Sequence, residues 1–426
     1  MLIYIVQAGD TLDTIAAAYQ TTTARLIADN GLGDPAQLNV GQALLLLFPA
    51  STYTVQAGDS LRSIAAAYGS SVRQLLRNNP QLAGEADIVP GQELTLAYTQ
   101  PRLGELLVNA YCYPNIDRAL LRFVLPYLSS LSIFTAGFTS AAELLPLDDA
   151  GLVAAARQYR VAPVMVLSPM DGADSFNNAL ISAVLPEAAL RQLLISNILR
   201  QLGERGYNGL DLDFEYVAVA DREAYSAFAA ELGERLRADG YTLNIDLAPK
   251  TYDGQPGLLY EGQDYAALGA AADTLLLMTY EYGYTYGPPM AVAPLPEITR
   301  VLDYALTRIP AAKLLLGIPN YGYDWPLPYV QGRTRATSIS NQRALELAWR
   351  YSQAIEFDGQ AQAPHFDYTD EQGVVHSVWF EDARSIRAKL ELAFDRGIRG
   401  VSYWTADRPF TQNWLLLNAL AAIAPE

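Results

Sequence analysis

Within residues 208–215, acidic and apolar side chains alternate strictly from Leu210 to Glu215. In a β-strand, side chains two positions apart share a face, so this pattern places Asp211, Asp213 and Glu215 on one wall and the apolar groups on the other. Neighbouring acids then lie roughly 6 to 7 Å apart along the backbone, close enough for their side chains to share a proton. At least one carboxyl group is expected to stay protonated near neutral pH, where it can act as a general acid. The same alternation also fits an amphipathic strand whose acids are simply solvated.

Short β-rich runs alternate with helical patterns from about residue 102 to the end of the chain. The expected strands are 106–113, 131–138, 163–167, 209–216, 242–248, 274–281, 314–321 and 400–405, and helical patterns include 187–203, 222–238 and 383–396. This βα order implies parallel strands, and eight of them in roughly 320 residues favour a closed (β/α)8 TIM barrel of the α/β class. Reactive groups in such barrels lie at the carboxyl ends of strands, where Glu215, Tyr280 and Trp404 fall.

One stretch, at about residues 323–382, interrupts the barrel pattern. Three prolines break it, and two short β-rich runs follow at 366–368 and 374–380. We expect a hairpin inserted between the last two barrel strands, where it would form part of the rim of a groove. The barrel and this small insertion are expected to occupy residues 102–426.

The beginning of the chain contains a tandem repeat. Residues 6–10 recur as 55–59, and residues 15–19 recur as 64–68, both at an offset of 49. Each copy predicts a short strand, a Gly-Asp turn, a helix capped by Thr11 or Ser60, a second helix and a closing strand, which is the order βααβ. Two small domains, 1–49 and 51–98, are therefore expected before the barrel.

Each repeat resembles the LysM domain, which holds the N-acetylglucosamine units of peptidoglycan or chitin. The resemblance rests on the repeated Val-Gln-Ala-Gly-Asp and Ile-Ala-Ala-Ala-Tyr motifs within a βααβ unit. The expected core of the first copy is Leu12, Ile15, Leu26 and Leu44. The resemblance implies a sugar groove formed by Gly9, Asp10, Thr11, Leu12 and Asn30 in the first copy and by Gly58, Asp59, Ser60, Leu61 and Asn79 in the second. Alternatively, these residues only form the turn and end the helices.

Composition narrows the class of protein. The chain has 426 residues, of which 51% are hydrophobic and 18% charged, as expected of a globular protein with a large core. A net charge of -17 argues against nucleic acid as a partner, because phosphate binding needs clustered Lys and Arg. Cys112 is the only cysteine and His365 and His376 the only histidines, so we expect no disulfide, metal site or cofactor. Neither a basic export signal nor an apolar span of about 18 residues is visible, and we expect a monomer made without an export signal or membrane anchor.

Four strand-end motifs are similar to those of family 18 glycoside hydrolases. The most specific is Gly209-Leu-Asp-Leu-Asp-Phe-Glu215 on the fourth expected strand. The others are Met278-Thr-Tyr-Glu-Tyr-Gly283, Gly317-Ile-Pro-Asn-Tyr-Gly322 and Gly400-Val-Ser-Tyr-Trp404, on the sixth, seventh and eighth strands. With the two LysM-like repeats they cover nearly the whole chain, an arrangement that resembles the spore cortex-lytic N-acetylglucosaminidases of endospore-forming bacteria.

The resemblance to family 18 implies a role for each residue. Glu215 would protonate the glycosidic oxygen, Asp213 would position the substrate's 2-acetamido group, and Asp211 would share a proton with Asp213. The acetamido oxygen would then attack the anomeric carbon, giving hydrolysis with retention and no enzyme nucleophile. Tyr280 would hydrogen-bond the acetamido oxygen and Trp404 would form the floor of the site. The remaining implied sugar-binding residues are Met278, Glu281, Tyr321 and Asn320.

Two positions depart from the family pattern. Asn208 stands where the family often has Asp, so a structural hydrogen bond is expected there instead of a titrating group. Glu281 stands where many chitinases have Asp, and a longer acid is expected to reshape the contact with the sugar. The implied function is hydrolysis of spore cortex peptidoglycan at a spore location. The alternatives are a chitinase and a silent glycan-binding lectin, of which the lectin is disfavoured because Glu215 is in place.

Overall fold

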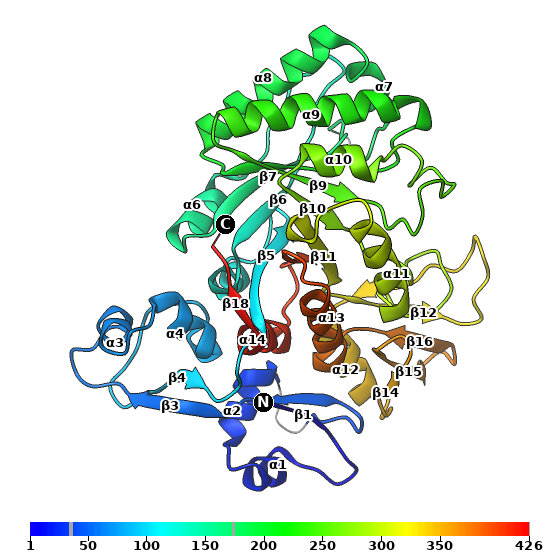
Figure 1. Ribbon diagram of the computed structural model, residues 1–426. Coiled ribbons are helices and arrows are strands. Elements are labelled where there is room, and N and C mark those ends of the chain that lie inside the picture. The colour runs from blue at the N-terminus through cyan, green and yellow to red at the C-terminus, as the bar shows by residue number, and fades with distance from the viewer. Residues whose placement is uncertain (34–36, 173–174, 426) are drawn as a thin grey trace.

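The computed structural model describes residues 1–33, 37–172 and 175–425. Its main body is a closed barrel of parallel strands surrounded by helices (Figure 1). The barrel strands are β5 (Gly104–Cys112), β6 (Ser130–Ala136), β7 (Ala162–Leu167), β8 (Gly209–Leu212), β9 (Thr242–Leu247), β10 (Thr274–Leu277), β11 (Leu314–Pro319) and β17 (Gly400–Trp404). Each pairs with the next, and β17 pairs with β5 to close the ring. The predicted (β/α)8 barrel is confirmed.

Helices cover the outer face of the barrel (Figure 1). They are α5 (Arg118–Val124), α6 (Ala150–Gln158), α7 (Ala179–Val184), α8 (Ala188–Arg205), α9 (Arg222–Ala238), α10 (Tyr265–Ala271), α11 (Leu295–Leu306), α13 (Ala383–Asp395) and α14 (Thr411–Leu420), with short 3-10 turns η2 (Leu125–Tyr127), η3 (Val219–Asp221) and η4 (Ala311–Lys313). In α9, Tyr225, Phe228, Leu232 and Leu236 are buried at the spacing that places one helical face on the sheet.

Several barrel strands end earlier than the sequence predicts: β6 at Ala136, β8 at Leu212, β10 at Leu277 and β11 at Pro319. β8 ends at Leu212, which pairs with Leu167 of β7 and Ile245 of β9. Because β7 ends at this level, the extended backbone that continues to Glu215 has no ladder partner on that side. A further short strand, β18 (Ala421–Ile423), pairs in parallel with the start of β5 and was not predicted.

The insertion after β11 is a small domain rather than a hairpin. It comprises β12 (Gly322–Pro326), β13 (Thr337–Ile339), α12 (Asn341–Arg350), β14 (Glu356–Asp358), β15 (Ala363–Thr369) and β16 (Val375–Trp379). The strands form one antiparallel sheet in the order β13-β12-β16-β15-β14, in which β15 and β16 are the predicted hairpin. Phe366, Val378 and Leu347 belong to its own buried core.

The two N-terminal repeats have the predicted order βααβ. The first comprises β1 (Leu2–Ile5), α1 (Leu12–Ala18), α2 (Thr23–Asn30) and β2 (Ala43–Leu46), and the second β3 (Pro49–Thr54), α3 (Leu61–Ala67), α4 (Val72–Asn78), the 3-10 turn η1 (Pro80–Leu82) and β4 (Glu93–Tyr98). Thr11 and Ser60 cap α1 and α3 as predicted. The four predicted core residues of the first repeat are all buried.

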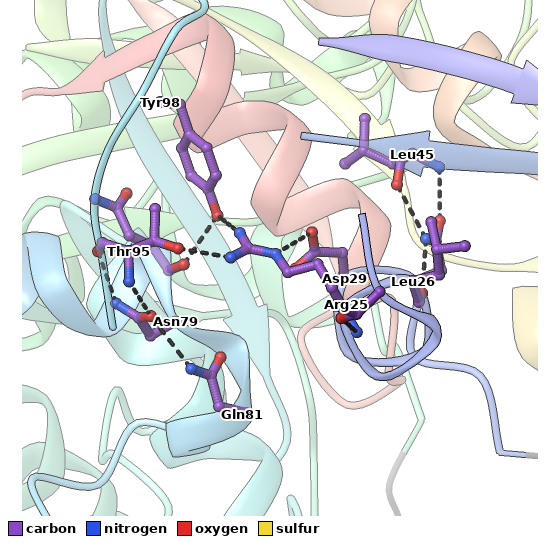
Figure 2. A network of polar contacts seen from close by, with 11 residues as sticks. Arg25, Leu26, Asp29, Leu45, Asn79, Gln81, Thr95 and Tyr98 are labelled. Atoms are coloured by element: carbon purple, nitrogen blue, oxygen red, sulfur yellow. Dashed lines mark hydrogen bonds and ion pairs between the residues drawn. The ribbon is translucent and has the colours of Figure 1, made fainter. Parts of the chain in front are cut away.

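Both repeats pack against the last barrel helix, α14. Gln412 Nε2 donates to Asn30 Oδ1 of the first repeat at 2.8 Å, and Asn418 Nδ2 donates to Asn78 Oδ1 of the second at 2.9 Å. The repeats also contact each other through Arg25, whose guanidinium donates to Thr95 and Tyr98 of the other copy (Figure 2). Buried polar pairs therefore fix the position of both repeats on the barrel.

The described residues were searched for a metal-binding group and for a membrane-spanning helix. No group of His, Cys, Asp and Glu side chains within the described ranges could hold a metal ion. Within the same ranges, no helix combines the length and apolarity needed to cross a bilayer. Cys112 is a buried free cysteine.

Candidate active site

The acidic row lies at the carboxyl end of β8 and just beyond it. Asp211 is fully buried, Asp213 is 4% exposed, and Glu215 is partly exposed. The apolar residues between them, Leu210, Leu212 and Phe214, are fully buried on the opposite side. The alternation predicted from the sequence thus continues past the end of the strand.

Asp211 sits in a hydrogen-bonded cluster at the centre of the barrel. Tyr111 Oη lies 2.6 Å from Asp211 Oδ2 and 2.8 Å from Asp246 Oδ1, and Ser132 Oγ donates to Asp211 at 3.0 Å. Asn244 Nδ2 donates to the other oxygen of Asp211 at 2.6 Å. Because a phenol carries only one proton, protonation of one of the two carboxyl groups would let both contacts of Tyr111 be hydrogen bonds at once.

Burial raises the pKa of each carboxyl group in the cluster. The pKa of Asp211 is raised by burial, and hydrogen bonds from Tyr111 and Asn244 oppose that rise. The pKa values of Asp213 and Asp246 are raised well above the ordinary range by burial and by neighbouring carboxylates. These groups titrate together, so the cluster as a whole holds protons near neutral pH.

The partner of Asp211 differs from the predicted one. Asp211 shares the hydroxyl of Tyr111 with Asp246 on β9, whereas the sequence interpretation assigned a shared proton to Asp211 and Asp213. Asp213 Oδ2 accepts a hydrogen bond from Ser168 Oγ at 3.1 Å. Its Oδ1 is buried and has no hydrogen-bond partner among the described residues. Asp213 therefore keeps one oxygen available for a donor outside the protein.

Glu215 and Asp213 line a cavity of about 990 Å³ at the mouth of the barrel. Burial, followed by the charge of Glu281, raises the pKa of Glu215 to about 7. A carboxyl group with this pKa is substantially protonated near neutral pH and can donate its proton to a leaving group. The cavity is large enough for several sugar units.

Four other predicted residues line the same cavity: Tyr280, Met278, Trp404 and Glu281. The Trp404 indole is held edge-on by Phe134 at a ring-centroid distance of 5.0 Å and by Tyr113 at 5.9 Å. Burial and nearby carboxylates raise the pKa of Tyr280 well above its ordinary value, so its phenol remains a hydrogen-bond donor. The cavity thus has an aromatic floor and a donor beside the acids.

Glu281 points toward a pair of tyrosines. It lies just beyond β10 with φ of 63°, and it accepts hydrogen bonds from Tyr321 Oη and, at 3.0 Å, from Tyr323 Oη. Tyr321 and Tyr323 line a second cavity, of about 510 Å³, that shares Glu281, Trp404 and Tyr113 with the first. Tyr321 was expected in the main pocket, but it lines only this adjoining cavity.

Two residues have different surroundings from those expected. Asn320 is 1% exposed, and its Nδ2 donates to the carbonyls of Thr405 and Arg408 at 2.9 and 2.8 Å. It therefore fixes the loop after β17 and does not line the sugar cavity. Asn208 is exposed at the opposite end of β8, and its backbone N–H, not its side chain, forms the hydrogen bond to Pro163.

The expected groove residues of the two repeats serve the repeats' own structure. Asn30 and Asn79 are buried, and each amide bonds backbone groups of the neighbouring strand. Figure 2 shows the contacts between Asn79 and Thr95. Leu12 and Leu61 are buried in the core of each repeat. Asp10 and Asp59 each accept a tyrosine hydroxyl and a backbone N–H. The turn glycines Gly9 and Gly58 have open space around them, while Thr11 and Ser60 cap helices.

Five residues of the acid cluster were missed in the sequence: Tyr111, Ser132, Ser168, Asn244 and Asp246. A signal was present for two of them, because Asn244 and Asp246 lie two positions apart on an expected strand, as Asp211 and Asp213 do. The three hydroxyl residues carry no such pattern. Only the closure of the barrel brings β5, β6 and β7 to the acids.

Comparison with known proteins agrees with this geometry. Residues 170–408 match the family described as Glycosyl hydrolases family 18, and residues 4–46 and 53–97 match the LysM domain. The chain is 38% identical to the cortical fragment-lytic enzyme of Bacillus anthracis over 97% of each chain. Its structure is similar to the spore cortex-lytic enzyme SleL of Bacillus cereus, with a TM-score of 0.84 and 37% identity over 99% of this chain and 98% of the other. SleL of Bacillus megaterium QM B1551 gives a TM-score of 0.83 and 35% identity, over 100% and 99%.

The matches extend over the catalytic barrel and both repeats. Asp211, Asp213, Glu215 and Asp246 lie within the residues that match the family, 170–408. The chain is a glycoside hydrolase that belongs to the glycosyl hydrolases family 18 and carries two N-terminal LysM domains.

Proposed function

We propose that the chain hydrolyses spore cortex peptidoglycan as an N-acetylglucosaminidase, cleaving the bond on the reducing side of N-acetylglucosamine. The observation that carries the proposal is Glu215, with a pKa of about 7, beside Asp213 in a sugar-sized cavity. The names of the similar enzymes from Bacillus anthracis and Bacillus cereus support cortex as the polymer.

The proposed reaction uses the substrate's own acetamido group. Glu215 protonates the glycosidic oxygen while the acetamido oxygen attacks the anomeric carbon, forming an oxazolinium ring. Water, deprotonated by Glu215, then opens the ring with retention of configuration. Intramolecular attack of this kind gains most of its rate from orientation, so the residues that hold the acetamido group matter as much as the acid.

The free oxygen of Asp213 supports this assignment. Asp213 Oδ1 is buried without a partner among the described residues, and such an atom is costly unless a ligand completes it. The acetamido N–H of the sugar is a fitting donor. The protonated phenol of Tyr280 would donate to the acetamido oxygen, and Trp404 would lie under the sugar ring.

The mechanism limits which sugar can contribute the reacting group. Many muramic residues of cortex carry a lactam, whose nitrogen is tied into a ring and cannot take part in this attack. This restriction excludes the lactam residues and favours N-acetylglucosamine as the sugar whose bond breaks. The two LysM domains would hold further N-acetylglucosamine units of the same glycan, which supports a location in the spore beside its polymer.

Product analysis tests the proposal. Purified cortex, intact and pre-fragmented, should yield fragments with N-acetylglucosamine at the reducing end by mass spectrometry. Muramic reducing ends would refute the assigned bond, and faster turnover of chitin oligomers than of cortex would favour a chitinase. Glu215→Gln should abolish release of sugars while retaining glycan binding, and unchanged release would refute the role of Glu215.

A further inference from the structure

The second cavity continues the catalytic cleft in one direction. Its lining includes Trp404, Glu281 and Tyr113 from the main cavity but not the acid Glu215 or Asp213. The main cavity is also lined by Glu215, Tyr216 and Tyr260, none of which lines the second cavity. The two cavities therefore adjoin at Trp404, with Glu215 on the side of the main cavity only.

The position of Glu215 orients the glycan in this cleft. Under the proposed function, Glu215 protonates the oxygen of the departing, reducing-side sugar, which therefore lies on the Glu215 side. The second cavity, of about 510 Å³, then takes the sugar on the non-reducing side of the cleaved N-acetylglucosamine. In an alternating glycan that sugar is a muramic residue.

Arg408 is the distinctive group of the second cavity. The described residues that line the two cavities include four aspartates, two glutamates and one cation, which is Arg408. The charge of this guanidinium acts on Glu281 and Asp407, but no carboxylate among the described residues forms an ion pair with it. It donates to Ile339 O at 2.6 Å and to Ser338 Oγ at 3.0 Å. Its planar group also lies 5.6 Å from the centroid of the Tyr321 ring. Since a guanidinium has five N–H donors, others remain for a ligand.

We propose that Arg408 binds the lactyl-derived carbonyl oxygen of the muramic residue in this second cavity and so selects peptidoglycan over chitin. This inference rests on the proposed function. The chemical reason is that chitin offers only hydroxyl and acetamido groups there, whereas a muramic residue adds a carboxylate or its lactam carbonyl at the third ring carbon. Either oxygen accepts a hydrogen bond from a guanidinium, and the carboxylate also has the opposite charge.

Three oligosaccharides test the inference in the full-length protein: a muramic–N-acetylglucosamine–muramic trisaccharide, the N-acetylglucosamine–muramic disaccharide that leaves the second cavity empty, and the N-acetylglucosamine trimer. Arg408→Met should lower kcat/KM on the muramic trisaccharide about 10- to 100-fold, and at least 10-fold more than on the other two substrates. Arg408→Lys, which keeps the charge, should restore part of the preference. Trisaccharides with a free lactyl carboxylate and with a lactam show which of the two oxygens Arg408 binds. Only hydrolysis of the carboxylate form should depend on the salt concentration.

A purely structural role for Arg408 predicts another pattern. Its bonds to the backbone of Ile339 and to Ser338 tie the loop after β17 to β13, and losing that support would lower kcat/KM on all three substrates equally. Equal loss, or no loss, would overturn the inference. Arg333→Met, at an exposed arginine of the same insertion, serves as the matched control and should change none of the rates. If the wild-type protein cleaved only the N-acetylglucosamine trimer, the proposed function itself would fail, which is a distinct result.

Discussion

The hydroxyl of Tyr111 on β5 lies 2.6 Å from a carboxylate oxygen of Asp211 on β8, across the interior of the barrel. The same hydroxyl lies 2.8 Å from Asp246 on β9, so a single phenol contacts two buried acids whose charges interact with that of Asp213. The protonation state of the acid row therefore depends on a residue remote from it in the sequence.

Tyr111→Phe should lower kcat about 5- to 150-fold, because removing a buried donor costs about 1–3 kcal/mol. The measurement is steady-state hydrolysis of an N-acetylglucosamine–muramic disaccharide. Tyr127→Phe is the matched control, since Tyr127 is equally buried but its hydroxyl bonds the backbone of Arg77, far from the acids. It should lower the melting temperature without lowering kcat; an equal loss of kcat in both variants would contradict the role of Tyr111.

The activity should decline as pH rises through about 7. Glu215 must be protonated to act as the acid, and burial together with the charge of Glu281 raises its pKa to about 7. Glu281→Gln removes that charge, so the alkaline limb of the kcat/KM profile should move to lower pH. Glu281→Asp keeps the charge and is the control. If the alkaline limb of the Glu281→Gln variant stayed at the wild-type pH, the charge of Glu281 would not influence the pKa of Glu215.

The same pKa predicts how stability depends on pH. A carboxyl group whose pKa rises from 4.5 to about 7 on folding holds a proton more tightly in the folded state, so its contribution is fully present below 4.5 and is lost by about pH 7. At about 1.4 kcal/mol for each pH unit, the loss is up to about 3 kcal/mol. Glu215→Gln should therefore raise the free energy of unfolding at pH 8 but not at pH 4, as measured by urea titration at both values. Equal effects at the two pH values would contradict the buried, shifted carboxyl group.

The sequence predicted the barrel because its strands and helices leave local periodic signals. Strands buried on both sides read as apolar runs, and helices such as α9 show one apolar face. The insertion was underestimated because its sheet joins distant residues, as in the pairing of Tyr323 with Trp379, which no local pattern reveals. The acid row itself was readable, since its alternation survives beyond the end of β8.

The parts of the site that could not be predicted depend on contacts between elements. Asn30 and Asn79 end helices in the sequence, and only the folded repeats show that their amides bond strands some 15 and 16 residues away. Asn320 follows β11 beside sugar-lining positions, yet its amide nitrogen donates to the loop after β17. In each case an asparagine amide could contact a sugar or bond the protein's own backbone, and the packing of the elements determines that it bonds the backbone.

Lys389 and Glu381 form an ion pair at 2.7 Å in which both side chains are fully buried. Lys389→Met should lower the free energy of unfolding by about 3–5 kcal/mol, because it leaves an uncompensated buried carboxyl group. The double variant Lys389→Met, Glu381→Leu should regain most of this loss, since an apolar pair of similar volume removes the desolvation cost of both charges. Chemical denaturation measures both values. A double variant as unstable as the single one would show that the pair stabilises the fold beyond mutual neutralisation.

Gly41 and Gly91 occupy equivalent turns of the two LysM domains, with φ of 82° and 87°. A methyl group at Gly41 would lie 1.9 Å from the backbone oxygen of Ile355 in the insertion, whereas one at Gly91 meets nothing within 4 Å. Gly91→Ala should therefore cost only the left-handed backbone strain, about 1–2 kcal/mol. Gly41→Ala should cost more, because it must also separate the first LysM domain from the insertion, where Ile355 N–H donates to Val40 O at 2.8 Å. Unfolding of both variants under identical conditions measures the difference, and equal stabilities would mean that this LysM domain is not held against the insertion in solution.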